Sequence, residues 1–273
     1  MKKKIIIGGV VFVLLAFVVA VIAIGTHLGE IVKSGVQTVG PKITQTTVTV
    51  DAVNITILSG SAQMKGFVLG NPRGYQTPQA ISVGIAAVSL SPGSLLKDKI
   101  VVHSIELRSP EITFEGNPLG ENNLMQILHN VNGGAAAVDA STNAPAAATP
   151  AEKKAARKLQ VDDLVIAGAK VHASLPGILN RPVDLTLPDI HLTNLGAGPD
   201  GITAADLAQK VLSAITDNTV KAVTVAATEI GRDAANAAKS TAREIVNGAL
   251  SGTNNVGESV DKLKKGLGGL LGK

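Results

Sequence analysis

Residues 102–114, VHSIELRSPEITF, and residues 161–173, VDDLVIAGAKVHA, carry apolar side chains at the same spacing. Alternating apolar positions are typical of a strand with one buried face. The opening of the pattern recurs at Val50, Val53 and Ile55. We interpret it as a repeated strand–turn–strand unit; the alternative is that unrelated half-buried strands share so short a pattern. The matched positions are Val102, Ile105, Leu107, Pro110, Ile112 and Phe114 in the first stretch, and Val161, Leu164, Ile166, Ala169, Val171 and Ala173 in the second.

The two stretches belong to two β regions, at residues 46–132 and 159–198. A phase slip between Ile85 and Val88 suggests a bulge in the first region. Pro188 marks an edge or a bulge in the second, because proline cannot donate a ladder hydrogen bond. Residues 133–158 are rich in Ala, Gly, Ser and Thr and predict a disordered linker.

A long helix is predicted over residues 203–250. Thr203 and Asp206 have the spacing of a capping box, and an alanine-rich stripe follows at helical spacing. This helix either packs on its own sheet or lies on a membrane or a partner. Residues 257–273 resemble a basic amphipathic tail.

The N-terminus predicts a membrane anchor. Residues 5–24 contain no charged, amide or hydroxyl side chain, and twenty residues of helix span about 30 Å, the thickness of the hydrocarbon core. Three lysines precede this run, so residues 1–4 are expected in the cytoplasm and the bulk outside it. Residues 26–45 then form a membrane-proximal stalk or helix. A cleaved signal peptide is the alternative, although the run is long for one.

Composition excludes several classes of function. The chain has no cysteine, so disulfides, thiolate metal sites and lipoprotein acylation are absent. Its net charge of +4 comes from the three N-terminal lysines and the lysines of residues 257–273, so the body is close to neutral. A neutral body with few aromatic residues disfavours nucleic-acid binding.

No catalytic or metal-binding pattern stands out. The histidines are not spaced as zinc ligands on one helix, and no serine lies in a Gly-x-Ser-x-Gly elbow. Asp162 and Asp163 are adjacent, so in a strand they point to opposite faces. We therefore expect a protein that is not an enzyme and needs no cofactor or metal. The histidines are His27, His103, His129, His172 and His191.

A family resemblance rests on the order of several short motifs. Residues 71–75, NPRGY, follow an apolar run, and the pattern of residues 102–114 is followed by GENNL at 120–124 and LPDI at 187–190. In this order they resemble the AsmA-like family of Gram-negative envelope proteins, of which this chain would be a short member. A small desiccation-type β-sandwich is another fold with an Asn-Pro turn after a strand.

The resemblance implies an α+β fold: an N-terminal transmembrane helix, a curved, mostly antiparallel, groove-like β-sheet and a long C-terminal Ala-rich helix. Asn71, Pro72 and Gly74 would shape a turn. Ten or so strands at about 4.8 Å would extend only about 50 Å, too short to bridge two membranes. An apolar stripe would either close into a core or contact lipid, and it comprises Ile105, Leu107, Ile112, Phe114, Leu164, Ile166 and Val171.

The expected function is that of a single-pass, inner-membrane-anchored periplasmic protein. Its apolar β surface would contact phospholipid acyl chains and support envelope lipid homeostasis or outer-membrane assembly. The alternative is a membrane-anchored scaffold that docks a protein partner through its C-terminal helix.

Overall fold

The computed structural model describes residues 27–141, 158–176 and 182–250, together with Asp261 and Lys265. Within these residues, no helix is both long and apolar enough to cross a membrane. The predicted cytoplasmic residues 1–4 and membrane span 5–24 lie outside the described part, as does most of the predicted tail at 257–273.

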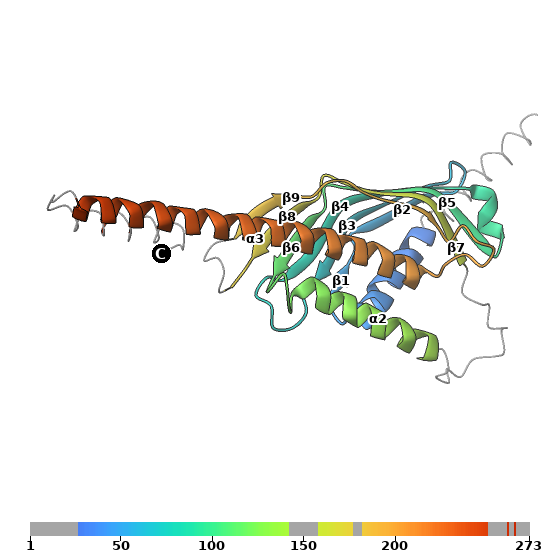
Figure 1. The fold of residues 1–273 in the computed structure, drawn as a ribbon. Helices are drawn as coiled ribbons and strands as arrows, with labels where there is room; N and C mark the ends of the chain where they lie inside the picture. Colours follow the sequence, from blue (N-terminus) through green and yellow to red (C-terminus); the bar gives the residue numbers. More distant parts are fainter. Residues whose placement is uncertain (1–26, 142–157, 177–181, 251–260, 262–264, 266–273) are drawn as a thin grey trace, which may run out of the picture.

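The described chain is α+β (Figure 1). Residues 27–44 form a first helix, within the range where the sequence predicts a stalk or helix. The remaining elements are β1 (Val48–Thr49), β2 (Ala52–Thr56), β3 (Ser61–Gly70), β4 (Gln79–Leu90), the short 3₁₀ helix η1 (Pro92–Leu96), β5 (Lys99–Arg108), β6 (Glu111–Glu115), α2 (Asn123–Ser141), β7 (Lys158–Ala167), β8 (Lys170–Ser174), β9 (Val183–Thr186), β10 (Ile190–Leu195) and α3 (Ala204–Leu250).

All ten described strands belong to one curled sheet. They fill six positions, because β1 and β2 both pair with β3, β5 and β6 both pair with β4, and β7–β8 and β9–β10 follow as two further in-line pairs. Six positions at about 4.8 Å make a sheet only about 25 Å wide, half the width expected from ten separate strands. A single sheet also excludes the desiccation-type sandwich.

The repeated pattern corresponds to two neighbouring strand pairs that lie in register. Val102 pairs with Val161 and Leu107 with Ile166 along β5 and β7, and Ile112 pairs with Val171 along β6 and β8. The pairing is parallel, so the sheet is mixed. The repeat unit is not a hairpin, because β6 continues beside β4 instead of folding back on β5.

In each of the six strand positions, the alternation of apolar residues changes phase at the same line across the sheet. We call this line the crease. The inner-face residues nearest the crease alternate on either side of it and are three positions apart across it, as in Val50 to Val53, Leu107 to Pro110 and Ile166 to Ala169. The same step occurs from Met64 to Phe67, from Val83 to Ala86 and from Leu187 to Ile190. An extra residue in a strand bends it and re-aims its side chains. The crease therefore bends the sheet while keeping apolar residues on its inner face.

At three of the six positions, a left-handed backbone conformation accommodates the extra residue. Gly66, Ser109 and Gly168 have φ angles of 61°, 47° and 64°. Ser109 N–H donates to the Ala167 carbonyl at 2.8 Å, and Gly168 N–H donates to Asp189 Oδ1 at 3.0 Å. Hydrogen bonding thus continues from strand to strand along the crease.

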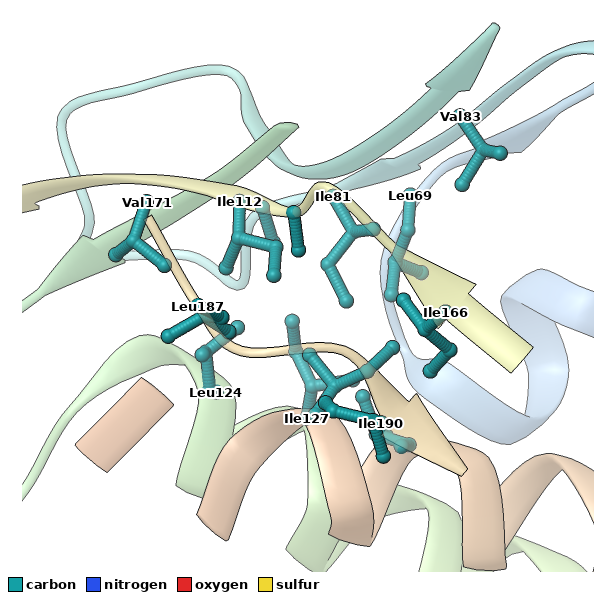
Figure 2. Packing of buried hydrophobic residues seen from close by; sticks show 14 of the residues in the cluster. Leu69, Ile81, Val83, Ile112, Leu124, Ile127, Ile166, Val171, Leu187 and Ile190 are labelled. Atoms are coloured by element: carbon teal, nitrogen blue, oxygen red, sulfur yellow. The ribbon is translucent and has the colours of Figure 1, made fainter. Parts of the chain in front are cut away.

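Two helices cover part of the inner face. Figure 2 shows Ile81, Ile112 and Val171 of the sheet pointing toward Leu124 and Ile127 of α2. α3 packs beside α2 and against β10, and its Leu212, Ile215 and Val223 are buried in the same core. Further along, α3 extends past the sheet (Figure 1).

The capping box predicted for α3 is present. Asp206 N–H donates to Thr203 Oγ1 at 3.0 Å, and Thr203 N–H donates to Asp206 Oδ2 at 3.0 Å. These bonds from the Thr203 backbone and hydroxyl lower the pKa of Asp206. The ionised carboxylate is thus favoured in the folded state, and its stabilising contribution is lost as the pH falls through this lowered pKa.

One predicted boundary differs from the structure. α2 continues to Ser141, nine residues into the stretch 133–158 that the sequence assigns to a linker. Residues 135–137 are alanine, the best helix former, so a low-complexity composition did not prevent helix formation. Residues 142–157 lie outside the described part of the chain.

The crease generates a first prediction. Replacing Gly66 with Ala should lower the free energy of unfolding by about 1–3 kcal/mol, because the backbone there is left-handed and a Cβ would collide with the Asp51 carboxylate. Gly84 is the control, since it lies opposite on β4, has no positive φ and has open space around a Cβ. Chemical denaturation of both variants measures the difference; equal stability of the two would contradict the role of Gly66.

Candidate functional site

The structure divides the predicted apolar stripe into two parts. Ile105 and Leu107, both on β5, are only half-buried. The remaining five residues are at most 1% exposed and lie in the core under α2 and α3: Ile112, Phe114, Leu164, Ile166 and Val171. Most of the stripe is therefore a closed core.

Two cross-strand rows connect this core with a partly exposed surface. Strand pairings run along the first row through Val53, Met64, Ala86, Leu107, Ile166 and Ile190. They run along the second through Ile55, Ala62, Val88, Ile105, Leu164 and Leu192. At β7 both rows are buried, whereas at β2 and β3 every member is half-buried.

We define the open patch as the half-buried members of these two rows on β2 to β5. They are Val53, Ile55, Ala62, Met64, Val88, Ile105 and Leu107. α2 packs mainly against β6, and α3 against β10, so the contacts of the two helices with the sheet centre away from β2 and β3. The open patch is an apolar surface that continues directly into the core.

Five of these residues were not among the sequence-predicted site residues: Val53, Ile55, Ala62, Met64 and Val88. A usable signal was present, because the three-residue step across the crease also occurs in β2, β3 and β4. The predicted stripe included only residues from 102–114 and 161–173, where the pattern is longest.

A polar cluster holds the end of the sheet beside the β3–β4 turn. Glu115 is 6% exposed and has no cationic partner among the described residues. Its carboxylate accepts the N–H groups of Gln76 and Thr77, each at 2.8 Å, and the Thr77 hydroxyl. Asn71 Nδ2 donates to the same carboxylate at 3.2 Å. Bonds to backbone N–H groups compensate for the burial of this charge.

The same cluster joins the turn to α2. Asn123 Nδ2 donates to Asn71 Oδ1 and to the Thr113 carbonyl, each at 2.7 Å. Pro72 is buried and Gly74 has a φ of 101°, both as a rigid turn requires. The structure thus brings together the NPRGY and GENNL motifs and places them away from the open patch.

Tyr75 lies in the same turn, within the electrostatic influence of two carboxylates. Burial raises the pKa of its hydroxyl, and the negative charges of Glu121 and Glu115 raise it further.

Two histidine–aspartate pairs lie outside this cluster in the described part of the chain. His103 Nδ1 lies 3.2 Å from Asp162 Oδ2, and His172 Nδ1 lies 2.6 Å from Asp184 Oδ1. Both pairs are largely exposed and stand apart from the apolar rows. Among the described residues no three acidic or histidine side chains gather as metal ligands.

Two buried hydroxyls lie within the helix that covers the core. Thr216 and Thr219 of α3 are fully buried, and neither Oγ1 has a hydrogen-bond partner in the part of the chain that the structure describes. An unpaired buried hydroxyl costs about 1–3 kcal/mol. This cost opposes the closed position of α3, although the apolar contacts of the helix favour it.

The described part of the chain is an α+β fold, a curled mixed sheet whose apolar inner face is partly covered by two helices. The chain belongs to the AsmA family, whose family model matches residues 1–174. The match therefore extends through β8. No curated protein and no solved structure matches the chain. Membership indicates a lipid-related function associated with the bacterial envelope.

The buried hydroxyls generate a second prediction. Thr219→Val should raise the free energy of unfolding by about 1 kcal/mol, because valine keeps the shape of threonine and removes the unpaired group. Thr228→Val is the control: Thr228 is exposed on the same helix and its hydroxyl donates to the Thr224 carbonyl at 2.8 Å. Denaturant titration compares them, and a loss of stability in Thr219→Val would show that the hydroxyl has a partner.

Proposed function

We propose that this protein is a non-catalytic, inner-membrane-anchored periplasmic member of the AsmA family, whose open patch contacts phospholipid acyl chains. It would thereby support lipid homeostasis of the envelope or assembly of the outer membrane. The observation that carries the proposal is the continuity of the two apolar rows, which run from the buried core into a partly exposed surface.

The free energy for lipid contact would come from desolvation. Each methylene that leaves water contributes about 0.8 kcal/mol, and the open patch offers aliphatic partners without a charged group among them. A water-exposed apolar surface of this kind is characteristic of interaction sites.

Movement of α3 would enlarge this surface. The rows continue beneath α3, so displacing the helix would extend the patch toward Leu164 and Ile166. The unpaired hydroxyls of Thr216 and Thr219 support such movement, since they weaken the closed arrangement.

The size of the sheet limits the mechanism. A width of about 25 Å is shorter than even one bilayer with its headgroups, which measures about 40–45 Å. We therefore propose that the protein holds or hands over lipid at one membrane and does not form a continuous bridge by itself.

Site-specific photo-cross-linking in the full-length protein tests lipid contact. A photoreactive amino acid at Ile105 should yield phospholipid adducts in intact cells, whereas the same group at His103, exposed on the same strand, should yield few. Mass spectrometry of the purified protein identifies the adducts. Equal labelling at both positions, or none at Ile105 and Met64, would refute the proposal.

A scaffold function is the second candidate, and one feature of α3 favours it. The last residue of this helix that packs on the core is Ala227. The helix continues past the sheet (Figure 1), and Val246, which follows Ala227 by 19 residues, is exposed. This projecting half offers a surface for a protein partner.

Truncation after Ala227 distinguishes the two functions. If lipid contact is the function, the shortened chain should keep both its lipid adducts at Ile105 and the barrier property of the outer membrane, measured by uptake of a normally excluded dye. Loss of the barrier with adducts retained would favour the scaffold. A charge-neutral control, Lys239→Gln with Glu244→Gln, leaves the length of α3 unchanged.

A further inference from the structure

The first helix, residues 27–44, is attached to the edge of the sheet by one side. Lys33 Nζ donates to the Asp51 carbonyl at 2.8 Å, and Gln37 Nε2 donates to the Val50 carbonyl at 3.4 Å. Gly29 and Gly40 lie on the same side, where a Cβ would collide with the Val53 carbonyl and come within 3 Å of Val48 side-chain atoms. These contacts fix how the helix is rotated about its axis and cover the otherwise open β1–β2 edge (Figure 1).

Another side of this helix is apolar from Leu28 to Val39 and faces away from the sheet. At about 100° per residue, its five members fall within an arc of roughly 100°. We call this set the seam, and it comprises Leu28, Ile31, Val32, Gly35 and Val39. Ile31 is 66% exposed, Val32 43% and Val39 41%, and nothing lies within 4 Å of a Cβ at Gly35. A row of exposed branched apolar side chains is unusual on a side of a helix that faces only water.

We infer that the seam rests on the interfacial region of the inner membrane, so that the β1–β2 edge of the sheet lies beside the bilayer. This inference rests on the proposed membrane anchor and assigns a second contact to the same membrane.

The position of the seam in the chain identifies the bilayer as its occupant. The apolar run ends at Ile24, and four residues cannot carry Leu28 more than about 14 Å from it. The headgroup layer is itself about 5–8 Å thick on each side, so the start of the seam cannot leave the vicinity of the membrane surface. Amphipathic helices in that layer bury their apolar face about 5–10 Å deep.

The exposure of the seam from Ile31 to Val39 agrees with one orientation of the helix. Val39 lies eleven residues after Leu28, about 16 Å along the helix axis, and is as exposed as Val32. Only a helix that lies roughly flat on the surface brings both valines to the same depth.

The charges on the helix agree with this orientation. Glu30 falls on the side nearly opposite the seam, where it would stay in water. Lys42 falls within the arc of the seam, three residues after Val39, and is exposed, so its ammonium group could reach lipid phosphates.

Single cysteines report the depth directly, since the natural chain contains none. We would spin-label full-length Val32→Cys and Val39→Cys, reconstituted in vesicles of phosphatidylethanolamine and phosphatidylglycerol. Collision rates with oxygen and with a water-soluble nickel chelate would be measured for each label. Ser34→Cys is the matched control, because Ser34 is exposed on the same helix but lies outside the arc of the seam.

Labels at 32 and 39 should show an oxygen-to-nickel collision ratio several-fold higher than the label at 34. A nickel accessibility at both valines equal to that at 34 would overturn the inference. So would strong spin–spin broadening at 39, which would assign the seam to a second copy of the chain.

Carbonate washing of the same vesicles separates this result from the proposed anchor. If the protein stays in the vesicles but the seam is accessible to nickel, the inferred surface contact is refuted and the proposed anchor is not. If carbonate washes the protein out of the vesicles, the proposed anchor, on which the proposed function depends, is refuted.

Discussion

The structure depends on keeping apolar side chains on one face of a sheet that bends. A strand that bends without an inserted residue would carry its alternation through unchanged, and a strand with an inserted residue changes face. Here all six positions insert a residue at the same line, so their apolar sets change phase together. The core under α2, the open patch and the in-register repeat all follow from this shared step.

Much of the fold could be predicted from local pattern. The β regions, the long C-terminal helix and the Thr203–Asp206 cap all follow from periodicity and spacing, which are properties of neighbouring residues. The parallel pairing of Val102 with Val161 could not be predicted in this way, because it depends on a crossover through α2 and residues 142–157. The repeat revealed that the two stretches were equivalent but not that they were neighbours.

The candidate site was predictable to the same extent. Ile105 and Leu164 have equivalent spacing and pair with each other, yet one is half-buried and the other buried. What distinguishes them is the position of α2 and α3, which spacing within a strand does not encode. The same holds for Thr219, whose hydroxyl is unpaired only because of where α3 lies, and for Gly29, whose missing side chain admits the β2 backbone.

The parallel pairing of β5 with β7 also constrains the order of folding. His103 and Asp162, bonded across this pair, are separated by 59 residues. β3, β4 and β5 can pair through short connections as soon as they are synthesised, whereas the β5–β6 edge has no partner until residues 158–174 have followed. During that interval an unpaired strand edge beside an apolar face is open to association with other chains. The rate at which residues 109–174 are added to the chain therefore becomes a determinant of how much protein reaches its native state.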